Sequence, residues 1–333
     1  MTVLKFAVEN GCGCCSADVS DQLLTIDEAL HAITLIAVPV PEKQVLNLAL
    51  AGGRVLADQV VATAMAPPFD NSAMDGYAVR IRDMTGDGPW TLPVQDRLPA
   101  GDNRTLGLAP GHAIQILTGA RVPSGTDAVV MQEAVATHRE GVTFSTRPKP
   151  GQHIRRTGDD MRIGDVALAA GQTLGARDIA TAAATGAATV TVRRDIRVAI
   201  LVTGEEVQSA GTALDNAQIW DVNTPLLAAA IARPGVEIIA ISHIGDNRQD
   251  LARELDRLSR VSDLIVTTGG VSVGEEDHMP AAIKQAGGRI EFAGVAMKPG
   301  KPVSVGRVGQ ALWLGLPGNP VSAFVAWTLF GTH

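Results

Sequence analysis

Residues 264–274 read Leu-Ile-Val-Thr-Thr-Gly-Gly-Val-Ser-Val-Gly, an apolar run followed at once by a loop rich in glycine and hydroxyl side chains. A short apolar run bounded by glycine predicts a buried strand. Two more apolar runs, 196–202 and 236–241, lie upstream, and a helical pattern separates each run from the next. Strands that alternate with helices predict a parallel sheet with helices on both faces. We therefore expect an α/β/α three-layer domain over residues 195–333.

The first half of the chain has a different pattern. Apolar residues at helical spacing follow Thr25 and stop before Pro39, which predicts one helix. Short alternating segments, cut by glycine, proline and aspartate, then predict a compact β region over residues 66–160. An alanine-rich helix around 178–185 and a further strand come after it. We expect a multi-domain α/β and β protein: a helical/β scaffold domain built from 23–65 and 161–194, with 66–160 inserted as a β domain.

Composition excludes several classes of protein. The 333 residues predict roughly two domains, and 46% hydrophobic against 19% charged residues excludes a disordered chain. A net charge of −7 argues against general nucleic-acid binding. No uncharged apolar run of about 18 residues occurs, so we expect no membrane-spanning helix.

The three cysteines, Cys12, Cys14 and Cys15, all lie in residues 1–22, which we expect to be a flexible extension. Without a secretory signal, reduced thiols in the cytoplasm are expected rather than a disulfide framework. A soft-metal site at this cluster is the alternative.

Polar residues follow the predicted strands. In open α/β sheets, ligands bind beyond the carboxyl ends of the strands. Backbone N–H groups of a glycine-rich loop can hold a phosphate or another oxyanion, and carboxylates at the same edge can hold Mg²⁺. An ordinary glycine turn and solvated acidic caps are the alternatives. The candidates here are Thr203, Gly204, Glu206, Asn223, Asp246, Gly269, Gly270, Ser272, Gly274 and Asp277.

Five further loops are candidates for ligand contacts. Lys298 and Lys301 lie in a loop fixed by proline and glycine, from which they can reach phosphate oxygens. Residues 316–320, Leu-Pro-Gly-Asn-Pro, set a rigid turn at a predicted helix start, for which a plain structural cap is equally credible. In the β region, residues 67–78 read Pro-Pro-Phe-Asp-Asn-Ser-Ala-Met-Asp-Gly-Tyr-Ala, and the polar loops 118–120 and 155–160 follow.

Together these motifs resemble the molybdopterin molybdenumtransferase family, which includes the molybdenum insertase MoeA and relatives in gephyrin and plants. The resemblance runs from about residue 23 to 330. It is carried by 68–78, 118–119, 155–160, 203–206, Asn223, Asp246, 269–277, 298–302 and 315–322. It implies a molybdopterin-binding α/β domain of the MoCF/MogA-like type. It also implies a cytoplasmic transferase of molybdenum cofactor biosynthesis, which inserts molybdenum from molybdate into adenylylated molybdopterin with Mg²⁺ and releases AMP.

The resemblance implies partners and site residues as well. The partners would be a second copy of the chain, sharing its active sites in a homodimer, and molybdopterin adenylyltransferase and molybdoenzymes. The catalytic residues would be Asp75, Asp160, Glu206, Asp246 and Asp277, and the metal ligands Glu206, Asp246 and Asp277. The substrate-binding residues would be Thr118, Thr203, Gly204, Asn223, Gly269, Gly270, Ser272, Gly274, Lys298, Lys301, Pro317 and Pro320.

One departure from the family keeps other functions open. Family members usually carry a small β domain after the Asn-Pro helix, and we expect it to be absent here because the sequence stops at His333. One alternative is a molybdopterin adenylyltransferase, which uses ATP and a similar glycine-rich domain. The other is a non-catalytic molybdopterin-binding scaffold. The β region with its Asp-Asn-Ser-Ala-Met-Asp-Gly-Tyr loop favours the insertase over the adenylyltransferase.

Overall fold

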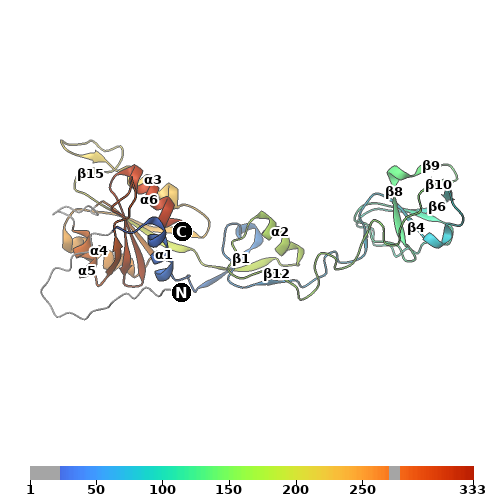
Figure 1. Cartoon of the computed structure of the whole chain (residues 1–333), viewed down its shortest axis with the longest axis horizontal. Helices are drawn as coiled ribbons and strands as arrows, with labels where there is room; N and C mark the ends of the chain where they lie inside the picture. Colours follow the sequence, from blue (N-terminus) through green and yellow to red (C-terminus); the bar gives the residue numbers. More distant parts are fainter. Residues whose placement is uncertain (1–22, 270–277) are drawn as a thin grey trace. The chain divides into compact units, whose positions relative to one another are not determined.

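The computed structural model describes residues 23–269 and 278–333 (Figure 1). These residues form two compact units. The α/β unit contains residues 23–42 and 194–333, and the N-terminal unit contains residues 43–193. Among the described residues, no helix is long and apolar enough to cross a membrane.

A six-stranded sheet forms the centre of the α/β unit, in the order β17-β14-β18-β21-β20-β19. The first four strands in this order are parallel, as predicted, whereas β20 and β19 run antiparallel to their neighbours. A two-residue turn joins β20 to β21, and so short a turn can only connect antiparallel strands. The strands are β14 (Ile196–Thr203), β17 (Val236–Ile244), β18 (Leu264–Thr268), β19 (Arg289–Ala293), β20 (Ser304–Val308) and β21 (Ala311–Leu316).

Helices cover both faces of this sheet (Figure 1). Alternate residues of β14 point to opposite faces: Val198 and Ile200 pack with α1, α3 and α6, and Ala199 and Leu201 pack with α4 and α5. The predicted three-layer α/β/α arrangement is therefore confirmed. The helices are α1 (Ile26–Ile36), α3 (Asn223–Ile231), α4 (Arg248–Ser259), α5 (Met279–Gln285) and α6 (Pro320–Ala326), followed by a π-helical turn, Trp327–Gly331.

Helix α1 begins as predicted but packs in a different place. The Thr25 hydroxyl accepts a hydrogen bond from Glu28 N at 3.2 Å, and the Glu28 carboxylate accepts one from Thr25 N at 2.8 Å, which completes a capping box. Our predicted boundaries placed this helix in the scaffold domain. Its buried residues Ala29 and Ile33 instead join the core of the α/β unit. An apolar stripe indicates that one face of a helix is buried, but it does not indicate which element packs against that face.

The scaffold part of the N-terminal unit has a small apolar core of its own, which includes Leu56, Leu174, Ala182 and Val192. Strand β1 pairs with β13, and β2 pairs with β12, both antiparallel. The predicted alanine-rich helix is confirmed as α2. The elements are β1 (Lys43–Asn47), the 3₁₀ turn η1 (Leu48–Leu50), β2 (Val60–Val61), β12 (Val166–Leu168), α2 (Ala176–Ala184) and β13 (Thr189–Arg193).

Residues 66–160 are built from short strands, as predicted. One sheet has the order β6-β7-β4-β8, another has the order β5-β10-β9, and β3 pairs with β11. The assignment of this segment to a separate inserted domain stays a prediction. The elements are β3 (Asn71–Ser72), β4 (Gly76–Val79), η2 (Ile81–Asp83), β5 (Trp90–Leu92), β6 (Val94–Leu98), β7 (Ala113–Ile116), β8 (Ala128–Met131), η3 (Gln132–Ala134), β9 (Ala136–His138), β10 (Gly141–Phe144) and β11 (Ile154–Arg155).

Candidate functional site

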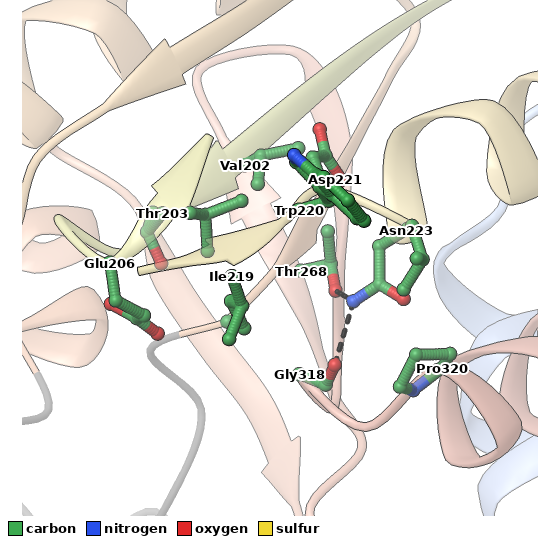
Figure 2. A pocket seen from close by; sticks show the side chains of 13 residues that line it. Val202, Thr203, Glu206, Ile219, Trp220, Asp221, Asn223, Thr268, Gly318 and Pro320 are labelled. Carbon is green, nitrogen blue, oxygen red and sulfur yellow. Dashed lines mark hydrogen bonds between the residues drawn. The ribbon is translucent and has the colours of Figure 1, made fainter. Parts of the chain in front are cut away.

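A cavity of ≈ 260 Å³ lies at the carboxyl ends of β14 and β18 in the α/β unit (Figure 2). Five of the predicted site residues line it: Thr203, Glu206, Asn223, Gly269 and Pro320. They come from four separate parts of the sequence and meet because parallel strands end at one edge of the sheet. The other lining residues are Val202, Val207, Ile219, Trp220, Asp221, Val222, Thr268 and Gly318.

Asn223 holds the wall of this cavity together. Its Nδ2 donates to Thr268 Oγ1 at 2.8 Å and to the Gly318 carbonyl at 2.7 Å (Figure 2). Thr268 Oγ1 in turn donates to the Pro317 carbonyl at 3.1 Å. A carbonyl oxygen can only accept a hydrogen bond, so the atom of Asn223 that contacts the Gly318 carbonyl must be the amide nitrogen. The predicted ligand residue therefore uses its N–H groups to join α3 to the ends of β18 and β21.

Thr203 and Gly269 bring two strand ends into close contact. Gly269 has a φ of +88°, and a Cβ there would lie 2.7 Å from the Thr203 carbonyl oxygen and 2.8 Å from Thr203 Oγ1. Only glycine combines this backbone conformation with so close an approach. Two buried oxygens beside the cavity, Thr203 Oγ1 and Asn223 Oδ1, have no hydrogen-bond partner among the described residues.

Carboxylates give the cavity an acidic rim. Glu206 is exposed in the turn after β14, and Asp221 Oδ1 accepts a hydrogen bond from Thr224 N at 2.9 Å. Thr224 lies in the first turn of α3, which begins at Asn223, so this hydrogen bond holds Asp221 against the start of the helix. Hydroxyl, amide and carboxylate oxygens are the donors that Mg²⁺ prefers, so the lining fits such an ion. Within residues 23–269 and 278–333, no three acidic, histidine or cysteine side chains converge as a metal site.

Several predicted residues of the α/β unit lie elsewhere. Asp246 is exposed after β17 and does not line the cavity, although His243 Nε2 lies 3.0 Å from the Gly204 carbonyl and links that strand end to the turn after β14. Lys298 and Lys301 are exposed in the loop between β19 and β20, and Pro317 contributes its carbonyl. Gly270, Ser272, Gly274 and Asp277 lie outside the described residues.

In the N-terminal unit, two of the predicted site residues, Asp75 and Thr118, are joined by hydrogen bonds. Asp75 Oδ1 accepts hydrogen bonds from Thr118 Oγ1 at 2.6 Å and from Thr118 N at 2.7 Å. These two bonds lower the pKa of Asp75 and keep its half-buried carboxylate charged. Asp160, the third predicted residue of this unit, lies on another loop and is paired with Arg155.

Our sequence analysis did not assign a role to Asp70, which the structure shows at the centre of a hydrogen-bond network. Its carboxylate accepts from Thr157 N at 2.8 Å, from Thr157 Oγ1 at 2.9 Å and from Arg156 Nη1 at 2.6 Å. These bonds lower the pKa of Asp70 and join its loop to the loop that carries Asp160. The available signal was its place in the motif 67–78.

Trp220 is a cavity residue that no sequence motif indicated. It lies in β16 (Ile219–Trp220), which pairs with β15 (Val207–Gln208) as a two-stranded ribbon beside the cavity. Aromatic residues are only 3% of this chain, so a tryptophan directly before the polar residues Asp221 and Asn223 was a usable signal.

Comparisons with known proteins place the chain in a family. Residues 24–186 match the MoeA N-terminal region (domain I and II), and residues 199–333 match the probable molybdopterin binding domain. The molybdopterin molybdenumtransferase of Haemophilus influenzae is 38% identical over 92% of this chain and 75% of its own length. Molybdopterin molybdenumtransferase 2 of Mycobacterium tuberculosis is 39% identical over 94% of this chain and 77% of its own.

A solved structure agrees with these matches. The molybdopterin biosynthesis MoeA protein from Pyrococcus horikoshii superposes with a TM-score of 0.79 at 29% identity, and the alignment covers 94% of this chain and 78% of that one. Similarity in sequence and in fold extends over both units of the chain. The chain belongs to the MoeA family of molybdopterin molybdenumtransferases.

Proposed function

We propose that this protein is a molybdenum insertase, which transfers molybdenum from molybdate into adenylylated molybdopterin and releases AMP. Its family membership supports the reaction class. The observation that carries the proposal is the cavity at the ends of β14 and β18, where Thr203, Glu206, Asn223, Gly269 and Pro320 meet. Binding of the pterin nucleotide at this cavity agrees with the general position of ligands on open α/β sheets.

The substrates are anionic, and the proposal assigns groups of the chain to their charge. Lys298 and Lys301 bind phosphate or molybdate oxygens, since ammonium groups are exposed in that loop. Glu206, Asp246 and Asp277 would hold Mg²⁺. When bound, this ion offsets negative charge on the phosphoanhydride oxygens. Asn223 keeps the ends of β18 and β21 in place, so that the bound nucleotide meets a preformed wall.

Asp75, Thr118 and Asp160 belong to the N-terminal unit, and we propose that they act in the active site of a homodimer. The two hydrogen bonds from Thr118 hold the Asp75 carboxylate in one orientation and in its charged form. A charged, oriented carboxylate can position a substrate without acting as a nucleophile. We further propose that the enzyme works in the cytoplasm, where it receives its substrate from molybdopterin adenylyltransferase and delivers the product to molybdoenzymes.

One assay tests the function. The protein is incubated with adenylylated molybdopterin, molybdate and Mg²⁺, and AMP release and active cofactor are measured. We expect turnover by the wild type and reduced turnover by Glu206→Gln and Asp277→Asn. Glu140→Gln serves as the matched control, because Glu140 is exposed in the turn between β9 and β10. Wild-type rates in both site variants would contradict the assigned residues.

The same assay separates the alternative functions. ATP-dependent adenylylation of free molybdopterin would identify an adenylyltransferase, and binding without turnover would identify a scaffold. Sedimentation tests the shared site independently, since only monomer at micromolar concentration would contradict the homodimer.

A further inference from the structure

Trp220 is the one aromatic residue among the described residues that line the cavity. The residue is 52% exposed, whereas Trp90, Trp313 and Trp327 are 9%, 1% and 4% exposed. An indole carries a large apolar surface, and leaving half of it in water is unfavourable unless something covers it. The exposed indole on the cavity wall is therefore a candidate ligand contact (Figure 2).

The indole is held in place before any ligand arrives. Trp220 Nε1 donates to the Thr212 carbonyl at 3.0 Å, which restrains the orientation of the ring. On either side of Trp220, Ile219 N donates to the Glu206 carbonyl at 2.8 Å and Asp221 N donates to the Gln208 carbonyl at 2.7 Å. A restrained ring loses little conformational freedom when a second ring stacks on it.

The rest of the lining suits a flat, nitrogen-rich ring better than an anionic group. The described lining residues include two carboxylates, Glu206 and Asp221, and no lysine or arginine. Carboxylates accept hydrogen bonds from ring N–H and amino groups. Gly269 and Gly318 come together without side chains, since a Cβ on Gly318 would lie 3.7 Å from the Gly269 Cα. A planar ring can approach such a bare backbone closely.

We propose that Trp220 is a substrate-binding residue whose indole stacks on a planar nitrogen heterocycle, the class to which both pterin and adenine belong. This inference rests on the proposed function, because it assigns a ring of that substrate to this cavity. The anionic part of the ligand then lies outside the acidic lining. Stacking on one face and the Asp221 carboxylate at the ring edge together favour flat N–H donors, and Glu206 stays available for Mg²⁺.

Tryptophan fluorescence provides a direct test, because Trp220 is the exposed tryptophan of the four. The emission of the full-length protein is measured in Mg²⁺ buffer during titration with AMP, with pterin-6-carboxylate and with ribose 5-phosphate, corrected for ligand absorption. We expect a change in emission with at least one ring compound and none with ribose 5-phosphate. The compound that responds identifies which ring occupies the cavity.

Variants complete the test. The dissociation constant of the responding compound, measured by calorimetry, should increase about 5- to 150-fold in Trp220→Ala. It should increase much less in Trp220→Phe, which keeps an aromatic face. Phe324→Leu is the control, because Phe324 is an exposed aromatic residue outside the cavity lining. Equal affinity in wild type and Trp220→Ala, or no response to either ring compound, would overturn the proposal.

These outcomes are distinguishable from failure of the proposed function. Ring binding that depends on Trp220 without release of AMP from adenylylated molybdopterin would support stacking and contradict the insertase. Normal AMP release by Trp220→Ala, with an unchanged KM, would contradict stacking and leave the insertase in place. Acrylamide quenching of Trp220 fluorescence provides a further control. If this quenching decreases as the protein concentration rises, without any ligand, another copy of the chain covers the indole, and the proposal is overturned.

Discussion

The cavity of the α/β unit and the polar loops of the N-terminal unit use opposite ways of positioning polar groups. At the cavity, Thr203 and Asn223 are buried, and strand ends and backbone carbonyls determine where they lie. In the N-terminal unit, Asp70 and Asp75 lie on loops, and hydrogen bonds from other loops hold them. The first arrangement depends on the sheet, so changes there should affect folding and binding together. The second depends on local hydrogen bonds between loops and should tolerate substitution better.

Gly76 lies in the N-terminal unit, yet we expect a substitution there to be tolerated worst, against the general contrast between the two regions. It lies in β4 between two neighbouring strands, and a Cβ there would be 2.1 Å from the Val130 carbonyl oxygen. Gly76→Ala should lower the free energy of unfolding by about 3 kcal/mol or more, because a central strand cannot move aside. Gly52→Ala, where no described atom lies within 4 Å, should change it by less than about 1 kcal/mol. Urea denaturation measures both, and equal values would refute the contact argument.

Gly269 tests the strand-end contact at the cavity. Gly269→Ala forces alanine into a φ of +88° and into contact with Thr203. Gly211→Ala is the matched control, because Gly211 has a φ of +89° and no described atom within 4 Å of a Cβ. Both carry the conformational cost of about 1–2 kcal/mol, and Gly269→Ala should lose roughly 2 kcal/mol more. Thermal unfolding together with AMP binding checks this. A loss no greater than that of the control would show that the contact is unimportant.

Asp263 tests how a partly buried ion pair makes the free energy of unfolding depend on pH. Partial burial by itself would raise the pKa of Asp263. Hydrogen bonds from the Arg194 guanidinium and from Arg197 N together have the larger effect and lower this pKa to about 2. Since the pKa of Asp263 in the folded protein lies below the ordinary aspartate value, this stabilisation is present above about pH 4 and is lost as the pH falls towards 2. It amounts to roughly 2 kcal/mol. Asp263→Asn should remove it at neutral pH and flatten the acid dependence of unfolding.

A second acidic residue controls for the effect of charge alone. Asp256 in α4 has a half-exposed side chain and pairs with Arg260, which directly follows the helix. Asp256→Asn should therefore leave the acid dependence close to that of wild type. The same curve for wild type and Asp263→Asn would contradict the role of the partly buried Arg194–Asp263 pair.

Asp70 should show the smallest effect on stability. Its pKa is lowered by the backbone hydrogen bond from Thr157 and by Arg156, so its contribution is present above the ordinary carboxyl pKa and is lost in acid. Its side chain is 36% exposed and solvent screens the ion pair, so Asp70→Asn should cost about 1 kcal/mol or less. We expect a clear decrease in turnover despite this small loss of stability. The reason is that Asp70→Asn weakens the hydrogen bonds that hold the loop that carries Asp160. Asp87→Asn, an exposed change in another loop, is the control, and equal turnover in the two variants would refute the positioning role.

Most of the fold of the α/β unit was predictable because its pattern is local. The apolar run 196–202 and the run that begins at Leu264 became β14 and β18. The packing of α1 was not predictable. Its stripe of Ala29 and Ile33 fits any apolar surface, and the residues it covers lie more than 150 positions away in the sequence.

The candidate site divides in the same way. Thr203, Glu206 and Gly269 were predictable because ligands bind where parallel strands end. The role of Asn223 was not, since its amide reaches Gly318, 95 residues later. Trp220 was missed because a two-residue ribbon carries no periodic pattern.

By itself, the sequence determined which segments become strands and helices, which motifs mark the family, and which polar residues follow each strand. These properties depend on local periodicity, glycine and proline positions, and side-chain chemistry. Only the tertiary structure decided that Asn223 bonds to the protein, that Asp70 joins two loops, and that Trp220 faces the cavity. Each of these contacts joins segments that only the assembled sheet or the folded loops bring within hydrogen-bond or van der Waals range.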